Sequence, residues 1–313
     1  MAHKPFILLI VALLAITGCV SKKQKENTLN FSGAFALYPL NIKWAEEYKK
    51  THEDVRFNIS GGGAGKGMAD ALAGTVDLGM FSREIAQAEK DKGVWWIGLC
   101  KDAVIPTISK NNPYLNELKK RGITQDEFRK IFIEGSIKNW NELLPNAGDE
   151  AITVHTRSDA CGAAGTWAKY LGGTQEDLVG VGIHGDPALA QAVSNDIFGL
   201  GFNNTIYIYD VKTNEKRPGI EIIPLDQNEN GQIDPEESFY NTFDDVLAAI
   251  ANGDFPSPPA RELYFVSKGK PTKKATLNYL KWTLTKGQKF VKEAGYVPIT
   301  QDKIDSYLKK LKQ

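Results

Sequence analysis

Residues 60–67 carry five glycines and one lysine in eight positions, a composition suited to binding an anion. The preceding residues 55–59 alternate polar and apolar types, as a short strand does, and residues 68–73 have apolar side chains at helical spacing. Glycines let a backbone approach a ligand closely, and the start of a helix offers unpaired N–H groups and a positive dipole end. The segment therefore predicts an anion site, with a flexible surface turn as the alternative.

This segment matches neither of two common phosphate loops. In a P-loop, Lys66 would be followed by serine or threonine and Ser60 would be glycine, and the dinucleotide pattern Gly-x-Gly-x-x-Gly fits in no register. The sequence gives no indication of a nucleotide.

Serine-bearing turns follow three predicted strands, at Ser32, Ser60 and Ser82, and in an open α/β sheet such strand ends converge on one cleft. A fourth turn begins at Arg157, after a predicted strand at 152–157, and enters a helix through small residues. A guanidinium matches two anion oxygens at once, so Arg157 is the candidate charge partner, with a structural arginine as the alternative.

Residues 226–237 have the pattern of a twelve-residue EF-hand calcium loop. Oxygen-bearing side chains fall at positions 1, 3, 5, 9 and 12, glycine at position 6 and an aliphatic residue at position 8. The candidate ligands are Asp226, Asn228, Asn230, Gln232 through its carbonyl, Asp234 and Glu237. A strand precedes the loop and a helix is predicted after it, so we expect a structural Ca²⁺ in a loop without an entering helix. An acidic turn is the alternative.

Nothing in the sequence supports an enzyme. His52, His155 and His184 have no metal or nucleophile spacing, and no general base stands out. Cys100 and Cys161 could form a disulfide in an exported protein, but two unpaired thiols are favoured.

The whole chain has 313 residues, and its Lys+Arg and Asp+Glu totals are both 38, which argues against a nucleic-acid binder. Residues 1–18 are predicted to be a signal peptide: a basic start, an apolar run and Gly18-Cys19. This resembles a bacterial lipoprotein signal, in which Cys19 is lipidated and anchors the exported protein in the periplasm or at the cell surface. The polar residues 19–28 would be a tether.

The order of these motifs resembles the phosphate-binding branch of the solute-binding proteins of ABC transporters. The matching segments are residues 32–39, 60–67, 79–83, 157–162, 263–271 and 295–298. The resemblance implies an α/β, two-lobed periplasmic-binding-protein-like fold of type II. The chain would cross between lobes twice, near 103–108 and 261–266. Lobe one would comprise 29–104 and 265–313, and lobe two 105–264.

In such proteins a dehydrated oxyanion lies between the lobes, which close around it. The resemblance implies an anion site built from Ser32, Gly33, Ala34, Ser60, Gly63, Ala64, Ser82, Arg83, Arg157, Ser158, Cys161 and Gly162. Each serine is alternatively a helix cap.

This sequence departs from the family pattern where familiar members carry hydroxyl groups. In the first turn, the place of a hydroxyl residue is taken by Ala34, Ala36 or Leu37, and in the second turn it is taken by Ala64. In the Arg157 turn, Cys161-Gly162-Ala163 replaces the family's Ser-Gly-Thr. The resemblance implies phosphate as the anion. The missing hydroxyl groups predict that backbone N–H groups hold more of it, and they leave sulfate, molybdate and tungstate open.

The predicted function is that of a monomeric, lipid-anchored binding protein that passes the anion to a membrane permease. A sensor or surface lipoprotein, or a hydrolase on the same scaffold, is the alternative.

Overall fold

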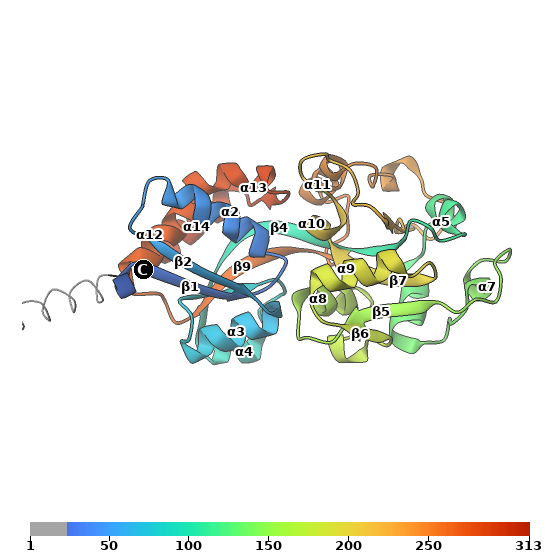
Figure 1. Ribbon diagram of the computed structural model, residues 1–313, viewed down its shortest axis with the longest axis horizontal. Coiled ribbons are helices and arrows are strands. Elements are labelled where there is room, and N and C mark those ends of the chain that lie inside the picture. The colour runs from blue at the N-terminus through green and yellow to red at the C-terminus, as the bar shows by residue number, and fades with distance from the viewer. Residues whose placement is uncertain (1–23) are drawn as a thin grey trace, which may run out of the picture.

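A single curved sheet runs through the whole computed structural model, which describes residues 24–313 (Figure 1). Its main strand order is β2-β1-β3-β9-β4-β7-β5-β6, and β8 and β10 also pair with β4. The strands are β1 (Thr28–Gly33), β2 (Arg56–Gly61), β3 (Leu78–Phe81), β4 (Val94–Ser109), β5 (Thr153–Arg157), β6 (Val181–Ile183), β7 (Gly199–Asn204), β8 (Ile220–Ile222), β9 (Ala260–Lys268) and β10 (Val297–Pro298). The predicted signal peptide and Cys19 lie outside the described residues.

Strand β4 belongs to both halves of this sheet. It pairs with β9 from Val94 to Ala103, and then with β7 from Val104 to Ile108. Figure 1 shows β4 and β9 running across the waist between two lobes. The α/β, two-lobed fold is therefore confirmed. We call the half containing β1, β2 and β3 lobe one, and the half containing β5, β6 and β7 lobe two.

Helices cover the sheet in both lobes (Figure 1). In lobe one they are α2 (Tyr38–Lys49), α3 (Gly63–Ala73), α4 (Gln87–Asp91), α12 (Lys274–Leu284), α13 (Lys289–Glu293) and α14 (Gln301–Lys312). In lobe two they are α5 (Leu115–Arg121), α6 (Gln125–Arg129), α7 (Trp140–Leu143), α8 (Gly162–Tyr170), α9 (Asp186–Asn195), α10 (Thr205–Ile208) and α11 (Phe243–Asn252). Short helical turns are Lys130–Glu134, Gln175–Asp177, Pro235–Glu237 and Lys286–Gln288. None of the helices within residues 24–313 combines the length and apolar character that a membrane span needs.

Helix α3 lies directly on the backbone of β1 and β3 because glycines face one another at the contact. A Cβ added to Gly67 would lie 2.4 Å from the carbonyl oxygen of Met80, and one on Gly79 would lie 2.2 Å from that of Gly67. Gly33 has φ +129°, and its added Cβ would lie 2.3 Å from the same Met80 oxygen. The glycines thus fix the start of α3 at the carboxyl ends of these strands.

Several sequence predictions of local structure are confirmed. The strand, glycine turn and helix predicted at 55–73 are β2 and α3. Thr124 with Glu127 three residues later is the sequence pattern of a capping box. Thr124 does cap α6, accepting from the N–H of Glu127 at 3.2 Å, and the Glu127 carboxylate accepts from the N–H of Thr124 at 3.0 Å. The alternation of isoleucine and tyrosine at 206–209 predicts a strand, but this prediction is wrong, since Thr205–Ile208 form the one-turn helix α10. A four-residue apolar run carries too little periodicity to separate strand from helix.

Candidate anion-binding site

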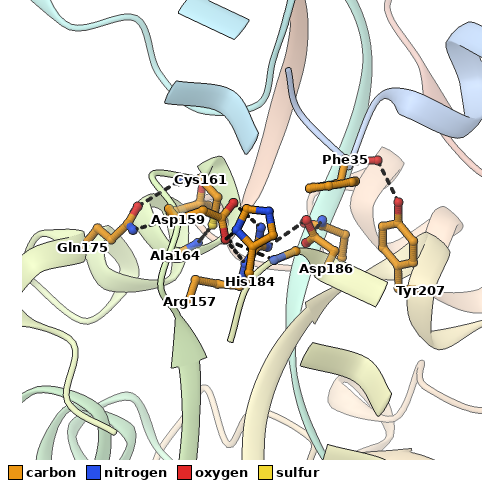
Figure 2. Close-up of polar contacts among 12 residues, drawn as sticks. Phe35, Arg157, Asp159, Cys161, Ala164, Gln175, His184, Asp186 and Tyr207 are labelled. Atoms are coloured by element: carbon orange, nitrogen blue, oxygen red, sulfur yellow. Dashed lines mark hydrogen bonds and ion pairs between the residues drawn. The ribbon is translucent and has the colours of Figure 1, made fainter. Parts of the chain in front are cut away.

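Arg157 lies at the end of β5, fully buried at the junction of the lobes, and two carboxylates surround it (Figure 2). Its Nε donates to Asp159 Oδ1 at 2.9 Å and its Nη2 donates to Asp159 Oδ2 at 2.7 Å. Its Nη1 lies 2.7 Å from Asp186 Oδ2 without the alignment of a hydrogen bond, so this second contact is ionic.

Asp186 connects Arg157 to a second buried arginine. It is the first residue of α9, and its Oδ1 accepts a hydrogen bond from Asn204 Nδ2 at the end of β7. Asn204 Oδ1 in turn accepts from Arg261, whose Nε donates to Asp102 Oδ1 at 2.8 Å. A buried polar chain therefore runs from β5 through α9 and β7 to the two crossing strands.

The carboxylates of this chain respond differently to burial. Burial alone would raise the pKa of Asp159, but the hydrogen bonds and charge of Arg157 hold it below its ordinary value. Burial raises the pKa of Asp186, and also that of Asp102, although the arginines beside them oppose the shift. Burial opposes protonation of Arg157, yet its pKa is raised, by Asp186 first, so it remains charged.

The starts of α3 and α8 face each other across the junction. The N–H of Gly65 in lobe one donates to the carbonyl oxygen of Ala160 in lobe two at 2.9 Å. A Cβ on Gly63 would lie 2.7 Å from Asp159 Oδ2, and one on Gly162 would lie 2.2 Å from both oxygens of Ser82. The lobes are therefore closed on each other, and this contact depends on the absence of side chains.

A further inter-lobe contact comes from two aromatic residues. Tyr207 on α10 donates its hydroxyl hydrogen to the carbonyl oxygen of Phe35 in lobe one at 3.0 Å (Figure 2). The Phe35 ring would lie 2.4 Å from a Cβ on Gly61 and 3.5 Å from one on Gly185. The ring thus fills the space between a glycine of each lobe.

A cavity of about 770 Å³ lies beside the junction, between the lobes. Its lining includes Gly65, Arg83, Cys161, Gln175, Arg261 and Tyr264. The cavity extends from Arg261 and Tyr264 on β9 to Cys161, at the start of α8.

The family model described as a PBP superfamily domain matches residues 20–286. The chain belongs to the PBP superfamily.

Among curated members of this superfamily, the phosphate-binding protein PstS of Bacillus subtilis is 25% identical over 285 residues, which cover 90% of this chain and 84% of the relative. The PstS protein of Methanocaldococcus jannaschii is also 25% identical, over 94% of this chain and 90% of the relative.

A similar solved structure is a putative phosphate ABC transporter substrate-binding protein with bound phosphate from Clostridium perfringens. Its TM-score is 0.71 at 20% identity, and the alignment covers 88% of this chain and 100% of that chain. The ABC-type phosphate transport receptor of Vibrio cholerae has a TM-score of 0.63 at 17% identity, and the alignment covers 87% of this chain and 100% of that chain. At these identities the likeness to the solved structures shows the PBP fold.

Five of the sequence-predicted site residues lie at or beside the lobe junction of this PBP protein. They are Gly63, Ser82, Arg157, Cys161 and Gly162. Ala64 is buried as the second residue of α3. The N–H of Cys161 donates to Gln175 Oε1 at 3.0 Å, and its sulfur accepts from the N–H of Ala164 at 3.3 Å. Burial raises the pKa of Cys161 to about 12, so its thiol is neutral. Cys100 and Cys161 are both buried free thiols, as predicted.

The other predicted groups are engaged in contacts of their own. Ser32 donates to Asp70 Oδ2 at 2.7 Å and Ser60 donates to the carbonyl oxygen of Phe31 at 3.2 Å. Ser158 is exposed, and its N–H donates to the Ile183 carbonyl oxygen at 3.1 Å.

Gly33 packs against α3, and the N–H of Ala34 donates to the Met80 carbonyl oxygen at 2.9 Å. Arg83 pairs with Glu89 at 2.7 Å while its guanidinium lies over the Phe81 ring. The structure therefore assigns the hydroxyl groups of Ser32 and Ser60 and the Arg83 charge to lobe one itself.

Sequence reasoning missed Asp186, Asn204, Phe35 and Tyr207. Asp186 between Gly185 and Pro187 has the pattern of a helix start with an acidic first turn. Nothing local to it indicates that it faces Arg157, because that contact is made between α9 and β5.

The polar side chains of loop 226–237 form hydrogen bonds within the loop. Asp226 Oδ1 and Oδ2 accept from the N–H groups of Asn230 at 3.2 Å and Gly231 at 2.9 Å, and Gly231 has φ +79°. Asp234 Oδ2 accepts from the side-chain amides of Asn228 at 2.9 Å and Asn230 at 2.8 Å. The side chains at loop positions 3, 5 and 9 therefore point toward one another.

The last carboxylate of the loop, that of Glu237, accepts backbone hydrogen bonds from Gln227 at 2.7 Å and Asp234 at 3.2 Å. Within residues 24–313, no group of three or more His, Cys, Asp or Glu side chains is placed to hold a metal ion. The loop is attached to α5 and its following turn, since the N–H of Ile233 donates to the Lys120 carbonyl oxygen at 2.7 Å.

Proposed function

We propose that this protein is the solute-binding component of an ABC transporter and captures inorganic phosphate between its lobes. The observation that carries the proposal is the buried Arg157 guanidinium, whose partner Asp159 lies against Gly63 at the start of α3. The curated relatives, which align over most of their length, are named phosphate-binding proteins.

The chain's own groups supply what an oxyanion needs. Both helix dipoles present their positive ends to the junction, and the N–H groups of the first turns have no partner within their helices. Among them, the N–H of Gly65 donates to Ala160 and that of Ala164 to Cys161 in this closed form. Arg157 supplies a buried guanidinium, which Asp159 and Asp186 contact in this structure, and Ser82 supplies a hydroxyl group beside Gly162. With few hydroxyl donors, backbone N–H groups carry most of the binding, so sulfate, molybdate and tungstate are the competing solutes to test. The protein binds its solute and does not transform it.

Calorimetric titration of the purified protein with phosphate, sulfate, molybdate and tungstate tests this function. We expect saturable binding of phosphate, one anion per protein, with the other three weaker: at neutral pH only phosphate carries a proton that it can donate, and molybdate and tungstate are also larger. If none of the four anions bound saturably, the proposed function would be wrong.

We propose further that Cys19 is lipidated after removal of residues 1–18 and anchors the protein, as a monomer, to a bacterial membrane in the periplasm or at the cell surface. The apolar run that ends at Gly18-Cys19 supports this. Mass spectrometry of the membrane-extracted protein should find a lipid on Cys19; an unmodified Met1 would contradict it.

We propose that loop 226–237 binds a structural Ca²⁺ through Asp226, Asn228, Asn230, the Gln232 carbonyl, Asp234 and Glu237. The inward-pointing side chains support this, and a half-turn of the Asn228 and Asn230 amides would present their oxygens in place of their N–H groups. The ion would stabilise lobe two by joining the loop to the chain before α11.

Calcium at about 100 times its dissociation constant should stabilise the protein by about 2.7 kcal/mol, because only the folded loop binds the ion. Thermal melting in excess calcium and in chelator measures the effect. The Asp234→Asn variant should lose it, and Asp210→Asn, an exposed aspartate of lobe two, should keep it. Identical melting of the wild type with and without calcium would contradict the proposal.

A further inference from the structure

The Asp186 carboxylate contacts Arg157 Nη1, the guanidinium nitrogen that an entering oxyanion would otherwise contact. Asp159 already takes Nε and Nη2 of the guanidinium, and Asp186 lies 2.7 Å from Nη1. The Arg157 side chain has no exposed surface, and that of Asp186 is 4% exposed. In this structure the guanidinium is therefore shared between two of the protein's own carboxylates.

The surrounding charges leave no positive charge for an anion. The buried chain contains two guanidiniums, Arg157 and Arg261, and three carboxylates, Asp102, Asp159 and Asp186, so one negative charge is in excess. In a poorly solvated interior, like charges a few ångströms apart repel strongly. A phosphate ion that enters beside Asp186 would meet this repulsion unless Asp186 becomes neutral.

The surroundings of Asp186 make a proton the simplest way to remove this repulsion. The groups that face it are Arg157 and Asp159 from β5 and its turn, Asn204 from β7, Asp102 from β4, Arg261 from β9, Tyr207 from α10 and Cys161 at the start of α8. The start of its own helix α9 favours the charged form. Burial outweighs the two arginines, and the pKa of Asp186 lies above its ordinary value.

We propose that Asp186 is an internal competitor for the solute, and that binding of the oxyanion to Arg157 is coupled to uptake of one proton by Asp186. The inference rests on the proposed function and concerns the same site. The proton comes from solvent or from a protonated phosphate and goes to Asp186 Oδ2, while Oδ1 keeps its hydrogen bond from Asn204. The neutral carboxyl group then donates to the anion, in a site that has few hydroxyl donors.

Phosphate calorimetry on the wild type and on Asp186→Asn tests this coupling, at about pH 5.5 and about pH 8 and in buffers with different ionisation enthalpies. At the higher pH, Asp186→Asn should bind phosphate at least about tenfold more tightly, because the wild type must first protonate a carboxylate. The advantage should shrink at the lower pH. The wild type should take up about one more proton per anion than the variant, since the ionisation of phosphate itself is common to both.

Asp210→Asn removes an exposed carboxylate of the same lobe and should behave as the wild type. An infrared difference spectrum of the wild type with and without phosphate gives a measurement that needs no variant: a carbonyl band of a protonated carboxylic acid should appear on binding.

Equal proton uptake and equal affinity in wild type and Asp186→Asn, or no such band, would overturn the inference and leave the proposed function intact. If neither protein bound phosphate saturably at either pH, both the function and the inference would be overturned.

Discussion

Replacement of Arg157 by alanine should lower the free energy of unfolding by about 3–5 kcal/mol and abolish phosphate binding. The guanidinium is the partner of two carboxylates, Asp159 at 2.7 Å and Asp186 at 2.7 Å, whose side chains are 8% and 4% exposed. Without it, two buried negative charges face each other with little solvent between them. Urea denaturation followed by tryptophan fluorescence measures the loss of stability.

The double variant Arg157→Ala with Asp186→Asn is the matched control for this result. It removes one of the two stranded charges, so its loss of stability should be smaller than that of Arg157→Ala alone. Such non-additivity is expected for groups in direct contact. A loss of less than about 1 kcal/mol in Arg157→Ala would be typical of an exposed ion pair and would contradict the burial on which the site depends.

Replacement of Gly162 by alanine should weaken phosphate binding by about 5- to 150-fold, because it prevents the lobes from closing. The added Cβ would lie 2.2 Å from the carbonyl oxygen and the hydroxyl oxygen of Ser82, in the opposite lobe. A backbone oxygen cannot rotate away, and overpacking of this kind costs about 1–3 kcal/mol, which corresponds to that range of affinity.

Gly165→Ala in the same helix is the control, since its Cβ would lie 3.4 Å from Arg83 Cδ, an ordinary contact. It should leave the affinity unchanged. Small-angle scattering should show a larger radius of gyration for Gly162→Ala than for Gly165→Ala in saturating phosphate. Equal affinity and equal size of the two variants would mean that the solute is bound without closure at Ser82.

The sequence was sufficient for the elements that carry the site, since their patterns are local. The alternation at 55–59, the glycines at 60–67 and the apolar spacing at 68–73 predicted β2, the turn and α3. The strand before Arg157 and the helix after it were predicted in the same way, and Arg157 does lie buried at the lobe junction.

The use of each hydroxyl group could not be predicted, because it depends on which acceptor is nearest in space. Ser32 was expected to donate to an anion, but Asp70, on α3, receives its hydrogen bond along with that of Lys66. Ser60 likewise finds a backbone carbonyl on the neighbouring strand β1. A serine at a strand end has an acceptor close by in the folded sheet, and the sequence does not show that acceptor.

The role of Asp186 could not be predicted either, because it depends on contacts with segments that are distant in the sequence. Its local pattern describes only the start of α9, whereas its role comes from the position of α9 beside β5 and β7. Long-range contacts of this kind are fixed by the packing of α9 on the sheet, which the pattern of a single segment does not contain.

Strand β4 has a consequence for how this protein can change over evolution. Because its first part completes the sheet of one lobe and its last part completes the sheet of the other, neither lobe is a separable module. A gene fragment that ended at Ala103 would encode a product with the backbone groups of an edge strand bare, ready to associate with other chains. Recombination could therefore not exchange one lobe for that of another protein without rebuilding the strand that the two halves have in common.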